Sequence, residues 1–175
     1  IQPWTISAVE YSPLKRIALL TSGGDCPGLN PCIRSVVRTA LASGLEIIGI
    51  HRGWQGLIEN DMAGMDARSV AGIVNLGGTV LRSSRCPEFR EAEVRQQAAL
   101  HLAEREIDGL IVIGGNGSLQ GAWELSRQAS LPVIGIPKTI DNDVGGTDYC
   151  LGFDTAVNTA VAAIDKIRDT ATSHE

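Results

Sequence analysis

Short apolar runs alternate along this chain with longer stretches in which apolar residues recur at the spacing of a helix face. The runs end in glycine or polar residues, a pattern typical of strands buried on both faces of a parallel sheet. The expected strands are 16–21, 45–50, 109–113 and 132–136. The expected helices are one that begins within 28–31 and stops at Gly44, then 66–76, 88–106, 117–128 and 153–170.

This alternation predicts an α/β protein. Helices between successive strands imply crossover connections and a mostly parallel sheet covered on both faces, which is a Rossmann-like three-layer sandwich. We assign residues 15–175 to one such domain. Residues 1–14 contain Pro3 and Pro13 and show no sustained period, so we expect an extended arm there. The pattern leaves the strand order open.

Composition narrows the class of partner. Hydrophobic residues make up 43% and charged residues 20% of the 175 positions, which is typical of soluble globular chains and not of disordered ones. The formal net charge of -5 and the pI near 5.2 argue against a general surface for nucleic acid or anionic lipid. We therefore expect small-molecule partners, with no nucleic acid and no membrane.

The cysteines and the first residues indicate the cytoplasm. No C-x-x-C pair occurs among Cys26, Cys32, Cys86 and Cys150, and a domain of this size does not need disulfides, so we expect reduced thiols. No apolar run reaches the roughly 18 to 20 residues of a membrane-spanning helix. Residues 1–14 lack the charged start and apolar middle of a signal peptide.

The first candidate site follows the strand 16–21. Glycines at 23, 24 and 28 within TSGGDCPGLN would let the backbone approach a bulky anion, and the next helix start would offer N–H groups to phosphate. The spacing is neither G-x-G-x-x-G nor G-x-x-x-x-G-K-[ST], so the dinucleotide and P-loop fingerprints are absent. A tight turn with helix caps would explain the same residues.

Two more loops follow predicted strands. The segment 113–118 (IGGNGS) leaves room for a polyphosphate or a purine, and Asn116 or Ser118 would cap the next helix. The segment 137–143 (PKTIDND) places two carboxylates beside an amide, a hydroxyl and an ammonium group, which could divide general-base work from metal or charge management. A cramped strand-to-helix turn and an Asx-rich turn are the respective alternatives.

The segment 77–85 (GGTVLRSSR) adds a glycine turn followed by two arginines. Arginine gives bidentate recognition of phosphate, although solvated surface arginines are the plainer interpretation. The three histidines, at 51, 101 and 174, lie far apart and form no ligand spacing, so we do not expect a zinc site.

Four motifs in this order resemble the phosphofructokinase family. They are G-G-D-x-P-G-x-N at 23–30, G-G-T-x-L-x-S-x-R at 77–85, G-G-x-G-S at 114–118 and P-K-T-I-D-N-D at 137–143. The resemblance covers about residue 16 to the last residue, and four motifs in register are highly specific. It implies the N-terminal, nucleotide-binding half of a 6-phosphofructokinase, which transfers a phosphoryl group from ATP to the 1-hydroxyl of fructose 6-phosphate in glycolysis.

The resemblance also implies roles for the matching positions. Thr139, Asp141 and Asp143 would bind the sugar hydroxyl, with Asp141 as general base and Asp143 assisting at the transferring group. Gly24 would lie against the donor phosphates and take part in catalysis. Mg²⁺ would assist an in-line transfer. The positions implied to bind the donor are Gly24, Trp54, Arg85, Cys86, Gly115, Asn116, Gly117 and Ser118.

Two positions bear on the donor. The resemblance implies that Gly117 leaves room for ATP, because pyrophosphate enzymes share an aspartate there, whereas Lys138 is typical of pyrophosphate enzymes. A carboxylate at 117 would crowd and repel ATP, while a lysine can swing aside or pair with phosphate. We therefore favour ATP, with a pyrophosphate-dependent enzyme as the alternative.

Departures from the family pattern suggest other interpretations. Asn116 stands where the family has an aspartate that helps to hold Mg²⁺, and hard cations prefer carboxylates, so we expect weakened metal binding. The family's second, sugar-phosphate domain is expected to be absent from a chain that stops at Glu175. A truncated, non-catalytic nucleotide-binding homologue is thus an alternative, although a mere binder would not need Asp141. The resemblance further implies a homo-oligomer and allosteric control.

Overall fold

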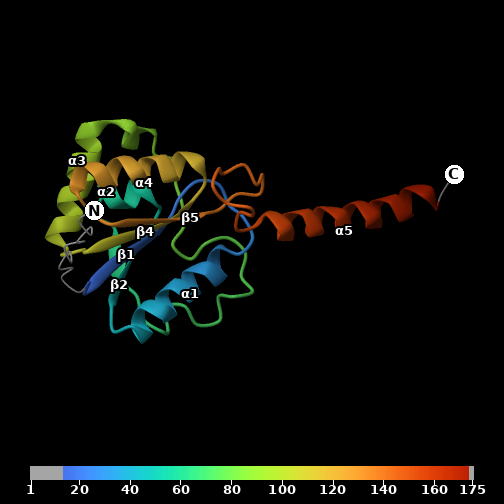
Figure 1. Ribbon diagram of the computed structural model, residues 1–175. Helices are drawn as coiled ribbons and strands as arrows, with labels where there is room; N and C mark the ends of the chain where they lie inside the picture. The colour runs from blue at the N-terminus through green and yellow to red at the C-terminus, as the bar shows by residue number, and fades with distance from the viewer. Residues whose placement is uncertain (1–13, 174–175) are drawn as a thin grey trace, which may run out of the picture.

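The computed structural model describes residues 14–173, and most of the predicted arm lies outside them. A five-stranded sheet has the order β3-β2-β1-β4-β5 and lies between helices on its two faces (Figure 1). The strands are β1 (Arg16–Thr21), β2 (Glu46–Ile50), β3 (Met62–Gly64), β4 (Gly109–Gly114) and β5 (Val133–Pro137). The helices are α1 (Leu29–Ala42), α2 (Trp54–Ile58), α3 (Ala92–Glu104), α4 (Asn116–Ala129), α5 (Phe153–Thr172) and the 3-10 turn η1 (Pro87–Arg90).

The predicted three-layer α/β sandwich is confirmed. β1 pairs in parallel with β2 and β4, and β4 pairs in parallel with β5. Only the short edge strand β3 runs antiparallel, against β2. A mostly parallel sheet needs cover on both faces, and α1 lies on one face while α2, α3 and α4 lie on the other (Figure 1).

The central strand β1 divides the core in two. Ala18 and Leu20 are fully buried in the cluster that contains the inner residues of α2, α3 and α4. Ile17 and Leu19 point to the opposite face and pack in the cluster formed with α1. This alternation follows from the two-residue period of a strand, and it explains why the run is apolar at almost every position.

The register brings the carboxyl ends of the parallel strands to one edge of the sheet. Thr21 aligns with Ile113 across β1 and β4, and Gly114 aligns with Pro137 across β4 and β5. The loops that leave β1, β4 and β5 are therefore neighbours. These are the segments that carry the sequence motifs.

The predicted helix over 66–76 is wrong. That segment forms turns without a helix. The Asp66 carboxylate accepts hydrogen bonds from the N–H groups of Arg68 and Ser69 over 2.9 and 2.8 Å, as an N-cap residue does at a helix start. Gly72 then takes a φ of +69°, which a helix does not allow. The apolar residues that suggested a helix, Val70 and Ile73, are instead buried against α1.

The predicted helix over 88–106 is split. Its first turn is η1, and Glu91 is extended with a ψ of 136° before α3 begins. The sequence also failed to indicate β3, which has 3 residues, and α2, which has 5. Elements this short carry too few residues for a period to be visible.

The predicted helix over 153–170 is confirmed as α5, which extends away from the sheet (Figure 1). None of its residues is buried, and Val161, Ile164 and Ile167 are among its exposed apolar side chains. Within residues 14–173, no helix combines the length and the apolar character that crossing a membrane would require.

Candidate functional site

Two buried serines join the loops that leave β1 and β4. The Ser118 hydroxyl donates a hydrogen bond to Ser22 Oγ over 2.9 Å, and the exposed fractions are 8% and 4%. The N–H of Ser22 also donates to the Ile113 carbonyl over 3.0 Å. The two glycine loops therefore meet at their first residues, where the chain departs from the sheet.

This junction lies where the winding of the sheet reverses. β1 leads through α1 to β2 on one side, and β4 leads through α4 to β5 on the other. Helices α1 and α4 lie on opposite faces of the sheet (Figure 1). In open α/β sheets the crevice outside such a switch point is where ligands bind.

The start of α4 differs from the sequence prediction. Neither Asn116 nor Ser118 caps the helix, because the N-cap residue is Gly115 and no side-chain cap bond is present. Ser118 bonds to Ser22, and the Asn116 amide donates to the Asp143 carbonyl over 3.2 Å. A helix start without a side-chain cap offers its N–H groups and the positive end of the helix dipole to an anion.

Two glycines beside this helix start have different constraints. A Cβ at Gly114 would lie 2.5 Å from the Ser118 Cβ, so the contact between the serines depends on a glycine there. A Cβ at Gly117 would meet nothing within 4 Å. Gly117 and Gly24 are both exposed, and their lack of side chains leaves the backbone accessible to a ligand.

A third loop is tied to the first through Lys138. This side chain is only 4% exposed, and its ammonium group donates a hydrogen bond to the Gly24 carbonyl. Burial lowers the pKa of Lys138 from its ordinary value. The sequence predicts a lysine that can swing aside or pair with phosphate, whereas the structure holds this side chain inside the protein.

The acidic turn that follows carries its carboxylates toward solvent. Asp141 and Asp143 are exposed. The N–H of Asp141 donates to Thr139 Oγ1 over 3.1 Å, and the Asn142 side chain accepts a hydrogen bond from the Cys150 N–H over 2.8 Å. One hydrogen-bonded turn thus contains Thr139, Asp141 and Asp143. The bond from Asn116 to the Asp143 carbonyl links this turn to the start of α4.

The segment 77–85 is also fastened to this edge. Thr21 Oγ1 donates to the Arg82 carbonyl over 2.8 Å and contacts Thr79 Oγ1 over 2.9 Å. Asn30 is 1% exposed, and its amide group donates to the Leu76 carbonyl and accepts from the Val80 N–H over 3.0 and 2.8 Å. All four motifs therefore meet at one edge of the sheet.

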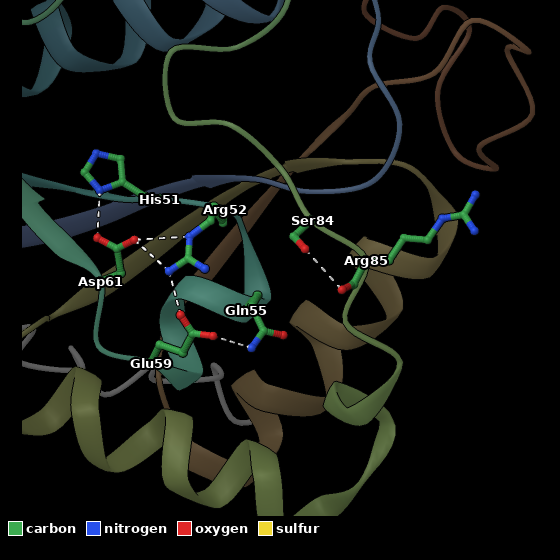
Figure 2. A network of polar contacts seen from close by, with 7 residues as sticks. All are labelled: His51, Arg52, Gln55, Glu59, Asp61, Ser84 and Arg85. Carbon is green, nitrogen blue, oxygen red and sulfur yellow. Dashed lines mark hydrogen bonds and ion pairs between the residues drawn. The ribbon is translucent and has the colours of Figure 1, made fainter.

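Arg85, the second arginine of this segment, is accessible to an anion. Arg85 is exposed, and its guanidinium group extends away from the polar cluster around Arg52 (Figure 2). Ser84 Oγ donates to the Arg85 backbone carbonyl over 3.3 Å. Within residues 14–173, the Arg85 guanidinium group takes part in none of the ion pairs.

Trp54 and Cys86 lie deeper than the other predicted donor residues. Trp54 is 5% exposed and stacks on Phe89 with ring centroids 4.1 Å apart. Cys86 is half-buried and packs against the same cluster, and burial raises the pKa of its thiol. Both residues have a packing role, and their contact with a nucleotide stays a prediction.

Sequence reasoning missed a polar cluster after β2 (Figure 2). Arg52 Nη2 lies 2.6 Å from a Glu59 carboxylate oxygen and 2.9 Å from one of Asp61. His51 Nδ1 lies 3.0 Å from the other Asp61 oxygen. Hydrogen bonds from His51 and then Arg52 hold the pKa of Asp61 below its ordinary value. Gly56 was the available signal, since a Cβ there would overlap the His51 carbonyl.

The candidate metal ligands are oxygen donors. Within residues 14–173, no group of three or more histidine, cysteine, aspartate or glutamate residues is placed to hold a metal ion. The Asn116 amide donates its N–H to the Asp143 carbonyl over 3.2 Å, which fixes the orientation of the amide group relative to the acidic turn. An amide oxygen with exposed carboxylates suits a hard cation such as Mg²⁺ that shares its coordination with substrate phosphates.

The fold and the site define a class of protein: an α/β domain whose glycine loops and uncapped helix start meet at its switch point. A family model described as phosphofructokinase matches residues 16–175. The chain belongs to the phosphofructokinase family.

Similar proteins agree with this assignment. The chain is 57% identical over 162 residues to an ATP-dependent 6-phosphofructokinase of a Sulfurihydrogenibium species, covering 93% of this chain and 50% of that protein. It is 58% identical to the protein of that name from Persephonella marina, with the same coverage. The solved structure of phosphofructokinase from Saccharomyces cerevisiae matches with a TM-score of 0.83 at 35% identity, covering 91% of this chain and 25% of that chain. This chain thus spans about half the length of the curated relatives it matches.

Proposed function

We propose that this chain is the donor-binding half of an ATP-dependent 6-phosphofructokinase. The observation that carries the proposal is the Ser22–Ser118 junction, which sets two glycine loops and the uncapped start of α4 at the switch point. Curated relatives above 50% identity bear the name of this activity. The acceptor is fructose 6-phosphate, and the transfer to its 1-hydroxyl is a step of glycolysis.

The donor phosphates would lie against the two glycine loops. Backbone N–H groups at Gly115, Gly117 and Ser118, at the uncapped start of α4, would face these phosphates, and the helix dipole favours negative charge there. Gly24 presents exposed backbone from the opposite loop, and Arg85 supplies a cation that forms no ion pair with a carboxylate among residues 14–173. Such positioning and electrostatic stabilisation account for most of the rate of phosphoryl transfer.

The acidic turn would act on the acceptor. Asp141 accepts the proton of the attacking hydroxyl, and Thr139 orients this carboxylate, its Oγ1 lying 3.5 Å from an Asp141 oxygen. Asp143 balances charge at the transferring group. Mg²⁺, held by Asn116 and by donor phosphates, would supply charge neutralisation in the transition state.

Gly117 is the main support for ATP over pyrophosphate. The open space around it accepts the bulk of a nucleoside triphosphate, whereas an aspartate would add charge beside the phosphates. Lys138 is the residue that favoured pyrophosphate, and its burial against Gly24 weakens that argument because the side chain is only 4% exposed to a ligand. The donor is therefore ATP, with ADP as product.

The remaining assignments concern partners and place. The sugar-phosphate grip comes from the other half of the protein, whose length the relatives imply. We expect a homo-oligomer under allosteric control in the cytoplasm, where the free thiols of Cys26, Cys32, Cys86 and Cys150 are stable.

A second candidate function is nucleotide binding without catalysis. The observation that favours it is Asn116, an amide at the position where a carboxylate would hold the metal more tightly. The exposed and braced Asp141 favours the enzyme, because a binding module would gain nothing from a base in that turn.

Thermal unfolding in the presence of donors tests the proposal. A ligand that binds only the folded state raises the free energy of unfolding by RT ln(1 + [L]/Kd). With Mg²⁺ present, ATP or ADP should raise the Tm more than pyrophosphate does at equal concentration. Stronger protection by pyrophosphate would make pyrophosphate the donor. The absence of protection by any of these ligands would contradict the proposal of a donor site.

A further inference from the structure

One buried residue, Lys138, connects the loops after β1, β4 and β5. Among residues 14–173, Lys138 is the one charged side chain in the buried class, at 4% exposure. Its Nζ donates to the carbonyl of Gly24, and its N–H donates to the carbonyl of Gly114 over 3.0 Å. A single residue thus contacts both glycine loops.

The ammonium group also lies beside the first turn. A Cβ at Gly23 would lie 3.5 Å from Lys138 Nζ and 3.6 Å from Ser118 Oγ, which is ordinary van der Waals contact. These two polar groups therefore border the space next to Gly23. Burying a cation is unfavourable unless it is hydrogen-bonded, and the pKa of Lys138 is lowered by its burial, so the Gly24 carbonyl is an important partner for this charge.

We propose that Lys138 is a positioning residue that holds the Gly23–Gly24 turn in the shape that meets the donor phosphates. The identity of the ligand rests on the proposed function, whereas the clamp itself does not. At 4% exposure, the Lys138 side chain offers little surface to a ligand, whereas its bond to the Gly24 carbonyl acts on the turn itself. Changes at Lys138 therefore act on the ligand through Gly24.

Cys26 offers a reporter within this turn. It is 3% exposed, and burial raises the pKa of its thiol to about 11, with the charge of Lys138 acting in the opposite direction. Loss of the ammonium group would raise this pKa further and slow alkylation if the turn kept its shape. Release of the turn would expose Cys26 and speed alkylation. The two effects have opposite signs.

The test compares Lys138→Met with Lys166→Met, an exposed lysine on α5 that serves as the control. Alkylation of each cysteine by iodoacetamide and hydrogen exchange of residues 22–28 are followed by mass spectrometry, without nucleotide. A hydrogen bond to a charged group contributes enough that its loss should raise both rates roughly tenfold or more. Exchange in α3 and alkylation of Cys86, which packs in the other core cluster, should not change, and Lys166→Met should match the parent.

Slower alkylation of Cys26, or unchanged exchange over 22–28, would overturn the proposal. Faster exchange throughout α3 as well would also overturn it, because Lys138 would then stabilise the whole domain and not the turn. If Lys138→Met does not fold, Lys138→Gln, which keeps a donor one atom shorter, takes its place in the same comparison.

A second measurement separates the clamp from the proposed function. Saturating ATP with Mg²⁺ should restore slow exchange over 22–28 in Lys138→Met, with an ATP affinity roughly tenfold below that of the parent. An unchanged ATP affinity in a variant with a released turn would contradict the positioning role. If ATP bound neither protein, the proposed donor would be wrong while the effect on the turn would still establish the clamp.

Discussion

The hydroxyl of Ser118 donates a hydrogen bond to the hydroxyl of Ser22, although the two residues are 96 positions apart in the sequence. Both side chains are buried, so water cannot easily replace either partner. The contact fixes the loop after β1 against the start of α4. The separation of the two glycine loops depends on this junction.

Ser118→Ala should therefore destabilise the protein. The change leaves the buried Ser22 hydroxyl without its side-chain donor, and an unsatisfied buried group costs about 1–3 kcal/mol. Urea unfolding of Ser118→Ala, Ser22→Ala and the double variant forms a thermodynamic cycle. The double variant should lose less than the sum of the two single losses. Strictly additive losses would mean that the two hydroxyls do not interact.

Gly117→Asp tests the choice of donor with little disturbance of the fold. The position is exposed and a Cβ there meets nothing within 4 Å, so the free energy of unfolding should change by less than about 0.5 kcal/mol. The new carboxylate should weaken ATP binding by roughly tenfold or more, since like charges repel at this range. Urea unfolding measures the free energy of unfolding, and isothermal titration with ATP and with pyrophosphate measures the binding affinities. Equal ATP affinity in the parent and the variant would place Gly117 outside the donor site.

Asn116→Asp tests the metal. A carboxylate binds Mg²⁺ more strongly than an amide does, so ATP binding with Mg²⁺ should tighten. With Mg²⁺ removed by EDTA, the same variant should bind ATP more weakly than the parent, because the carboxylate then faces bare phosphates. An ATP affinity that is the same in both proteins across a Mg²⁺ titration would exclude Asn116 from the metal shell.

Asp61→Asn tests the cluster after β2 through its pH dependence. Hydrogen bonds from His51 and Arg52 hold the pKa of Asp61 below its ordinary value of 3.8. A carboxylate whose pKa is lowered on folding stabilises the protein above the unfolded value, and this stability is lost as the pH falls through the folded value. The urea midpoints of parent and variant should therefore differ at pH 6 and converge in acid. A gap that widened in acid would contradict the sign of the shift.

Strands and long helices were predictable because their periods extend over enough residues. Alternate residues of the run at 16–21 pack in two different core clusters. This is why the run is apolar at almost every position. The helix prediction for 66–76 was wrong because Val70 and Ile73 have helical spacing, whereas Asp66 begins a turn that Gly72 ends with a positive φ. Apolar spacing alone does not distinguish a helix from turns that bury the same residues.

The four motifs were predictable as loops at one edge, since parallel strands align their carboxyl ends. Their contacts were not. Ser118 appeared to be a helix cap, and its partner Ser22 lies in a distant loop. Lys138 appeared to be mobile, because a lysine is rarely buried and no local pattern indicates that Gly24 would accept its hydrogen bond. Side-chain partners so distant in sequence become visible only once the strand order is known.

The central claim is that Asp141 is the general base of a phosphoryl transfer at this edge. The most direct test uses a chimera in which residues 16–175 replace the matching half of the Persephonella marina relative, which is 58% identical. Asp141→Asn keeps the shape of the turn and removes the proton acceptor. Asp154→Asn, an exposed carboxylate at the start of α5, is the matched control.

The measurement is the kcat and the ATP KM of these two variants beside the unmodified chimera. General-base catalysis typically contributes roughly 10²- to 10⁴-fold, so Asp141→Asn should lower kcat by that factor with little change in the ATP KM. Asp154→Asn should leave both constants unchanged. A kcat of Asp141→Asn within about threefold of the unmodified chimera, equivalent to less than roughly 0.7 kcal/mol, would contradict the assignment of Asp141 as the base.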